Sequence, residues 1–136
     1  MLQNATSGAA LLDGAATAGS VSTAVSADDV TRRYGSGEAA VDALRGVTLD
    51  IPRGQFAAIM GPSGSGKSTL MHLLAGLDQP TSGTVHIAGE DITNMNDAQL
   101  TKLRRAHIGF VFQAFNLLPT LTAEENILLP LQLAGR

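Results

Sequence analysis

The sequence predicts an α/β fold in which an apolar strand runs through a glycine-rich loop into a helix. Residues 55–60 form a short apolar run, as in a strand covered on both faces. The loop at 61–66 holds three glycines, and the residues of 70–74 then place apolar side chains at helical spacing. Two further segments, 43–51 and 84–88, alternate apolar and polar residues as half-buried strands do. Strands of both kinds beside helices indicate the α/β class.

The chain begins with a segment, residues 1–27, that we expect to be a disordered tail. It contains eight Ala, four Ser, three Thr and three Gly, and Asp13 is its only charged residue. Such small side chains bury too little apolar surface to offset the entropy of ordering the chain. A weak helix over 9–18 is the alternative. The first cation is Arg32, so the segment does not fit a secretory signal or a mitochondrial targeting sequence.

Turn residues separate the elements of the central part. A Pro-Arg-Gly turn at 52–54 divides the first two strands. Gly76 stands where the helix after the loop should end. A second turn, at 80–83, precedes the strand that Gly89 ends.

Two capping boxes predict helices in the last third of the chain. Their members are Asn96 with Gln99 and Thr122 with Glu125. The first opens a short polar helix through Arg105, and the second opens a helix that Pro130 should kink or end. Glu124 and its neighbour Glu125 fit acids that complement the helix dipole. Between the helices, residues 108–112 are a further apolar strand.

The composition excludes several classes of protein. The net charge is −3, and a dedicated nucleic-acid binder would instead show a clustered basic face. The absence of cysteine excludes a disulfide scaffold and a thiolate metal site. No run of 18 apolar residues occurs, so no membrane span is predicted.

The sharpest chemical motif is GPSGSGKS at 61–68, which fits the phosphate-loop pattern G-x-x-x-x-G-K-[ST] at every fixed position. Glycines let the backbone wrap around phosphates, and the amides of the following helix face the same anions. A glycine-rich turn with a solvated lysine is the bland alternative, but the motif stands between a strand and a helix as phosphate binding requires. The predicted binding residues are Gly61, Pro62, Ser63, Gly64, Ser65, Gly66, Lys67, Ser68 and Thr69.

The residues around this loop resemble those of the ATP-binding cassette (ABC) ATPases. Residues 61–92, GPSGSGKSTLMHLLAGLDQPTSGTVHIAGEDI, follow the family's phosphate loop and next strands closely. Residues 104–113, RRAHIGFVFQ, end in what looks like the Q-loop glutamine. Tyr34-Gly35 and the segment ALRGV at 43–47 look like the adenine-stacking loop and the first sheet. Residues 114–130 most resemble the subfamily that serves lipoprotein release, macrolide export and FtsX-type permeases.

This resemblance implies a P-loop NTPase core of the ABC ATPase type with an antiparallel β-subdomain ahead of it. Residues 28–136 would be the N-terminal part of an ABC-type ATP-binding domain. The strands at 43–51 and 84–88 would belong mainly to the subdomain, and the strand at 55–60 to the central sheet.

The resemblance also implies roles for individual residues toward ATP and Mg²⁺. Tyr34 would stack on adenine, although a partly buried strand aromatic is the alternative, and Val41 would pack near the ribose. Lys67 would neutralise the β- and γ-phosphates, and Ser68 would ligate Mg²⁺. Gln113 would reach Mg²⁺ and the attacking water; its alternative is a solvated amide at a strand end.

The implied partners are a membrane permease and a second ATPase subunit. The loop at 115–119 would dock to the permease, and core packing is its alternative. The chain would then act in the cytoplasm at the inner face of the cell membrane, without nucleic acid.

The sequence departs from the family in lacking an LSGGQ-type signature, a Walker B strand ending in paired acids, and a switch histidine. We therefore expect the N-terminal half of a cassette ATPase, truncated or incompletely recorded, that is inactive in hydrolysis alone. Its three histidines, His72, His86 and His107, do not match the switch position. A non-transport ABC ATPase of the division or DNA-repair kind, or an inert nucleotide-binding fragment, is the alternative function.

Overall fold

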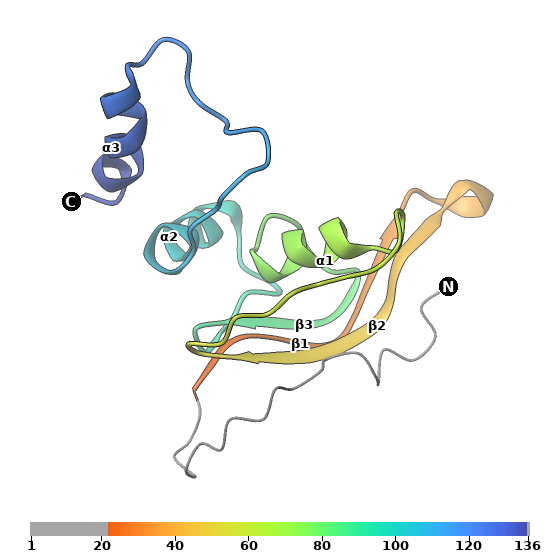
Figure 1. The fold of residues 1–136 in the computed structure, drawn as a ribbon. Coiled ribbons are helices and arrows are strands. Elements are labelled where there is room, and N and C mark those ends of the chain that lie inside the picture. Colours follow the sequence, from red (N-terminus) through yellow and green to blue (C-terminus); the bar gives the residue numbers. More distant parts are fainter. Residues whose placement is uncertain (1–21, 136) are drawn as a thin grey trace. The chain divides into compact units, whose positions relative to one another are not determined.

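The structure is a computed structural model that describes residues 22–135, and these divide into two units between Met95 and Asn96. The first unit carries a sheet and one helix, and the second carries two helices (Figure 1). The helices are α1 (Lys67–Leu74), α2 (Asp97–His107) and α3 (Ala123–Leu133). No helix within the described residues is long and apolar enough to cross a membrane. The mixed α/β class is confirmed.

Four antiparallel strands form the sheet of the first unit, in the order β2-β1-β3-β4 (Figure 1). Their bounds are β1 Thr23–Tyr34, β2 Val41–Pro52, β3 Ser82–Ile87 and β4 Glu90–Asp91, with a short 3-10 helix η1, Gly37–Ala39, between β1 and β2. The strands expected at 43–51 and 84–88 correspond to β2 and β3, so the antiparallel subdomain is confirmed.

Strand β1 corrects the boundary of the expected tail. Residues 23–27 had a tail-like composition, yet they begin the strand, and Ala27 is buried. Composition misleads here because β1 pairs with β2 on one edge and β3 on the other, and backbone hydrogen bonds form equally well with small residues. Residues 1–21, with the alternative helix over 9–18, lie outside the described residues.

Helix α1 packs on this sheet and closes its core. It contacts β1, β2 and β3, and Figure 1 shows it lying over one face of the sheet. Leu73 of α1, Val30 of β1 and Val85 of β3 are fully buried together in this unit. The helix ends as predicted, because Gly76 takes a positive φ of 62° and its amide donates to the carbonyl of Leu73 at 3.0 Å. The start of α1 is thereby held against the sheet.

Both capping boxes of the second unit are confirmed. The side chain of Asn96 accepts from the Gln99 amide at 3.0 Å, and the Gln99 side chain accepts from the Asn96 amide at 2.9 Å. Thr122 and Glu125 make the same reciprocal contacts before α3. Pro130 does not end the helix, which continues to Leu133. The proline lacks an amide hydrogen and removes one internal hydrogen bond, and the helix still continues three residues beyond it.

Two predicted strands, at 55–60 and 108–112, do not form. Phe56 is 95% exposed and Val111 is fully exposed. An apolar run becomes a strand only when neighbouring strands pair with its amides and carbonyls. No strand pairs with either segment in the part of the chain that the structure describes. The prediction of a central sheet strand at 55–60 is therefore wrong for these residues.

Candidate functional site

An open pocket of about 240 Å³ lies where the glycine-rich loop meets the beginning of β2. It is lined by Val41, Asp42, Ala43, Gly64, Ser65, Gly66, Lys67, Ser68 and Thr69. Six of the nine predicted phosphate-binding residues therefore surround one cavity, together with the predicted ribose neighbour. The other three, Gly61, Pro62 and Ser63, are exposed at the start of the loop and do not line it.

Close backbone approach explains the last glycine of the loop. Gly66 has a φ of 92°, and a Cβ placed there would stand 2.6 Å from the carbonyl oxygen of Ala43 and 3.0 Å from Leu44. Real Cβ atoms do not approach an oxygen so closely, so only glycine fits between the loop and β2. The loop is thus pressed against the strand that forms the opposite wall of the pocket.

The N-terminus of α1 opens into this pocket. Gly66 is the N-cap, no side chain caps the helix, and the first helical bond runs from the Leu70 amide to the Gly66 carbonyl at 2.9 Å. The earliest amides of a helix have no carbonyl partner within it and carry the positive end of its dipole. No acidic residue stands in the first turn of this described helix. The arrangement suits an anion such as a phosphate group.

Lys67 curls back over the loop. Its Nζ donates to the carbonyl oxygen of Pro62 at 2.7 Å and lies 3.4 Å from the Ser65 hydroxyl oxygen. A neutral carbonyl is a weaker partner for an ammonium group than a phosphate oxygen, because the phosphate oxygen carries the opposite charge and adds a Coulombic attraction to the hydrogen bond. The cation is therefore held at the pocket in a position from which a phosphate can recruit it.

Ser68 and Thr69 supply the hydroxyl groups of the pocket. The described residues contain no cluster of three or more His, Asp or Glu side chains that could hold a metal by themselves. Mg²⁺ does not need such a cluster, because it is commonly bound by one or two protein ligands together with phosphates and waters. A single serine hydroxyl beside an anion site therefore fits Mg²⁺ that arrives with a nucleotide.

Asp42 is the one acidic side chain among the described residues that line the pocket. Its Oδ1 lies 3.7 Å from Nε of Arg33, and both side chains are about half exposed. Such an exposed and loose ion pair contributes little to stability. It places a cation beside the carboxylate, which reduces the repulsion that a bound phosphate would meet.

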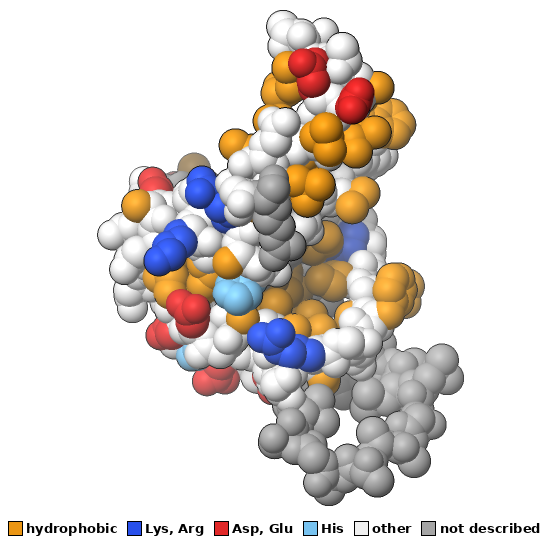
Figure 2. All heavy atoms as spheres, turned by 90° about the vertical axis from the view of Figure 1, so that its left-hand side faces the viewer, with side chains coloured by type: hydrophobic (Ala, Val, Ile, Leu, Met, Phe, Trp, Pro, Cys, Tyr) orange, Lys and Arg blue, Asp and Glu red, His pale blue; other side chains and the backbone are white. Residues whose placement is uncertain are grey.

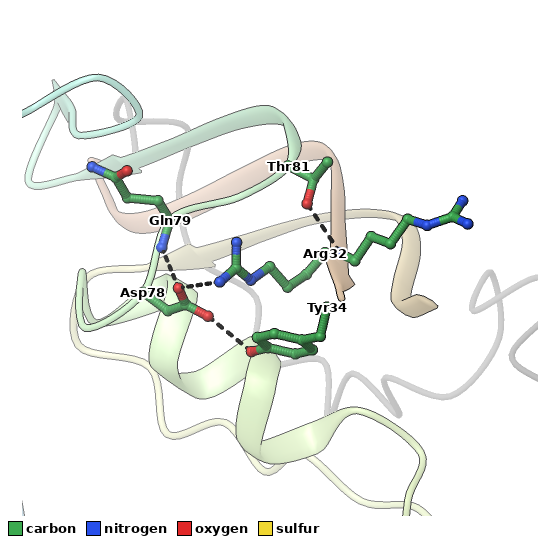
Figure 3. Close-up of polar contacts among 6 residues, drawn as sticks. Arg32, Tyr34, Asp78, Gln79 and Thr81 are labelled. Atoms are coloured by element: carbon green, nitrogen blue, oxygen red, sulfur yellow. Dashed lines mark hydrogen bonds and ion pairs between the residues drawn. The ribbon is translucent and has the colours of Figure 1, made fainter. Parts of the chain in front are cut away.

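Tyr34 lies at the end of β1 and does not line the pocket, although its strand partner Val41 does. Its hydroxyl donates to Oδ2 of Asp78 at 2.8 Å, and the guanidinium carbon of Arg32 lies 4.5 Å from its ring centre (Figure 3). Sequence reasoning missed Asp78, because no local pattern marks a carboxylate whose aromatic partner is 44 residues away. The structure places this aromatic at the exposed end of an inner strand, and adenine stacking stays a prediction.

Gln113 belongs to the second unit, in the exposed segment between α2 and α3, and its role at the phosphate loop stays a prediction. The following residues 114–119 are exposed, with Phe115 at 84% and Leu117 at 66%. Core packing is therefore not their role in this structure. Hydrophobic side chains also gather on the surface of α3, at the top of Figure 2.

Asn126 is a second residue that sequence reasoning missed. Its side chain accepts from the Leu118 amide at 2.8 Å and donates to the carbonyls of Leu118 and Leu121 at 3.1 and 3.2 Å. The first turn of α3 thereby fixes the end of the exposed segment that follows Gln113. The sequence signal that could have identified Asn126 is its position one residue after the capping box, because an asparagine there can hydrogen-bond the backbone of the preceding loop.

Residues 44–135 match the family model described as ABC transporter. An uncharacterized ABC transporter ATP-binding protein of Thermotoga maritima is 53% identical over 79% of this chain and 46% of its own length. The lipoprotein-releasing system ATP-binding protein LolD of Geobacter metallireducens is 50% identical over 79% of this chain and 48% of its own. The chain thus spans about half the length of these curated relatives.

The fold is similar to that of a solved structure at comparable identity. The ATP-binding cassette MJ0796, solved as a dimer in a post-hydrolysis state bound to ADP and Pi, is 50% identical and superimposes with a TM-score of 0.77. The match covers 82% of this chain and 48% of that one.

Proposed function

Because this chain belongs to the ABC transporter ATP-binding family, we propose that it binds MgATP through residues 61–69 as part of an ATP-binding subunit that powers a membrane permease. The observation that supports this most is the pocket at the start of α1. Loop glycines, free helix amides, a lysine and a serine hydroxyl converge there, and no acid stands in the first helical turn. These are the groups that bind the phosphates and the Mg²⁺ of a nucleoside triphosphate in a phosphate loop.

Binding would proceed by exchange of partners at the loop. Lys67 would leave the Pro62 carbonyl and bond the β- and γ-phosphate oxygens, while the first amides of α1 take the remaining oxygens. Ser68 would hold Mg²⁺, which supplies further neutralisation of phosphate charge. Phosphoryl transfer needs mainly such positioning and charge stabilisation from the protein.

The remaining site residues extend this proposal. Val41 would pack near the ribose, since it lines the same pocket, and Tyr34 beside it would stack on adenine. Gln113 would link Mg²⁺ and the attacking water to the permease through the exposed segment that follows it. Residues 1–136 contain no carboxylate of the Walker B kind and no signature loop, so we propose that these residues alone bind ATP without hydrolysing it.

The partners follow from the relatives. LolD is named for lipoprotein release, and a relative from Escherichia coli O157:H7, 50% identical, is named a macrolide export ATP-binding/permease protein. We propose a permease of this exporting kind, docked at 115–119, and a second ATP-binding subunit, as in the dimeric cassette. The site of action would be the cytoplasmic face of the membrane. These transport-associated relatives do not favour a division or DNA-repair role.

A binding titration tests the proposal. The full chain is titrated with a fluorescent ATP analogue in the presence of Mg²⁺. We expect Lys67→Ala to weaken binding roughly 10- to 100-fold, because it removes charge-assisted bonds worth about 1.5–3 kcal/mol. The chain has only one other lysine, Lys102 in α2, and Lys102→Ala serves as the matched control with unchanged affinity. Equal affinity of wild type and Lys67→Ala would remove Lys67 from the proposed site.

A further inference from the structure

The carboxylate of Asp78 is the centre of a closed polar cluster beside the aromatic ring of Tyr34 (Figure 3). Its Oδ2 accepts from the Tyr34 hydroxyl at 2.8 Å. Its Oδ1 pairs with Nη2 of Arg32 at 2.8 Å and accepts from the Gln79 amide at 2.8 Å. Three donors therefore fix one carboxylate, and that carboxylate fixes the far end of the ring.

Arg32 closes the cluster over the ring itself. Its guanidinium carbon lies 4.5 Å from the ring centre of Tyr34, within the range of a cation–π contact. Its Nε is buried without a hydrogen-bond partner in the described structure, a cost that marks the guanidinium as held in place by its other contacts. One face of the ring is thus occupied by Arg32. A flat ligand has only the other face on which to stack.

The cluster is also tied to the segment that follows α1. The Arg33 amide donates to the Thr81 hydroxyl at 3.0 Å, and the Thr81 amide donates to the Thr31 carbonyl at 2.8 Å. Asp78 itself comes four residues after the last residue of α1, whose first residue is Lys67 of the phosphate loop. A single short helix therefore connects the loop with the carboxylate that holds the ring.

We propose that Asp78, together with Arg32, is a positioning residue that presents one face of Tyr34 to the adenine base of the nucleotide bound at the phosphate loop. This inference rests on the proposed function. The Tyr34 side chain is 40% exposed, and an exposed ring that is free to rotate loses conformational freedom when a base stacks on it. Asp78 orders the ring before the nucleotide arrives, so the ordering cost does not reduce the affinity for the base.

The test compares two probes on the full chain: MgATP, which carries the base, and inorganic tripolyphosphate with Mg²⁺, which does not. Asp78→Ala is expected to weaken MgATP about three- to tenfold, the size expected for ordering one side chain, and to leave tripolyphosphate within twofold. Tyr34→Phe keeps the ring but removes the same hydrogen bond, so it should give the same pattern. The double variant should lose no more than Asp78→Ala alone, because Asp78→Ala already removes the hydrogen bond that Tyr34→Phe removes. Asp50→Ala, an exposed carboxylate on β2, is the matched control.

The outcomes separate the two proposals. If wild type binds neither probe, the proposed function fails and the role of Asp78 fails with it. If wild type binds both probes but Asp78→Ala and Tyr34→Phe weaken them equally, or weaken neither, the proposed function stands and the positioning role is overturned. Tyr34→Phe alone decides the matter should Asp78→Ala not fold. Since Tyr34 is the only tyrosine and the chain has no tryptophan, tyrosine fluorescence of Asp78→Ala without nucleotide reports whether the ring has changed its surroundings.

Discussion

Replacing Gly66 by alanine should damage folding and phosphate binding more than the same change at Gly64. Both glycines have positive φ, 92° and 77°, where an alanine costs about 1–2 kcal/mol. At Gly66 the new Cβ would also meet the Ala43 carbonyl oxygen at 2.6 Å, whereas at Gly64 nothing lies within 4 Å. That oxygen belongs to strand β2 and cannot yield without moving the strand. Overpacking of this kind adds about 1–3 kcal/mol.

Denaturant unfolding of the full chain measures the difference. We expect a loss of about 1–2 kcal/mol for Gly64→Ala and about 2–5 kcal/mol for Gly66→Ala. Titration with MgATP should show the larger loss at Gly66 as well, because the clash displaces the N-cap of α1. Gly89→Ala, in the open turn after β3 with a φ of 87°, controls for backbone strain away from the pocket and should leave binding intact. Equal destabilisation by the Gly64 and Gly66 variants would refute the argument from close approach.

Two further predictions concern the second unit and catalysis. The amide and then the hydroxyl of Thr122 hydrogen-bond the Glu125 carboxylate and hold its pKa below the usual 4.5. The stability that this carboxylate gives α3 is therefore present above its unfolded pKa and is lost as pH falls through the lower folded pKa. Circular dichroism should show a loss of helix in acid, and that loss should be smaller in Glu125→Gln. An acid profile of Glu125→Gln identical to that of the wild type would contradict this reasoning. A phosphate-release assay at saturating MgATP should find no turnover by residues 1–136, since a missing acid–base group alone costs about 10²–10⁴-fold. Turnover abolished by Asp42→Asn would instead identify the pocket's one carboxylate as the catalytic base.

Local patterns were predictable from the sequence. The capping boxes at Asn96 and Thr122 depend on residues three positions apart, and both form. The phosphate loop is equally local, because its motif residues, from Gly61 to Ser68, are consecutive in the chain. Such short-range hydrogen bonds and backbone conformations are written into neighbouring residues, so a sequence can reveal them.

Long-range pairing was not predictable in the same way. Strand β1 shows no alternation because its register shifts between Ala27 and Val30, where Asp29 takes a positive φ of 44°. Because of this bulge, the two buried residues of β1, Ala27 and Val30, are three positions apart in the sequence, which interrupts the alternation of buried and exposed residues that a regular strand shows. Conversely, the apolar run at 55–60 has the composition of a buried strand, but no strand among residues 22–135 pairs with it. In both cases partner strands decide, and the pattern within the segment does not contain them.

Helix α1 sets the separation between the phosphate loop and Asp78 in the proposed site. Its eight residues span about 12 Å at the usual rise of an α-helix. The phosphate loop lies at its first residue, and Asp78 follows its end and holds Tyr34. Because Leu73 is completely buried against the sheet, neither end of the helix can shift without disturbing the core. A nucleotide whose phosphates bond Lys67 and whose base stacks on Tyr34 would therefore contact residues that one rigid helix holds at a fixed separation. Substitutions at Asp78 should then weaken the binding of the base, and substitutions at Gly66 should weaken the binding of the phosphates.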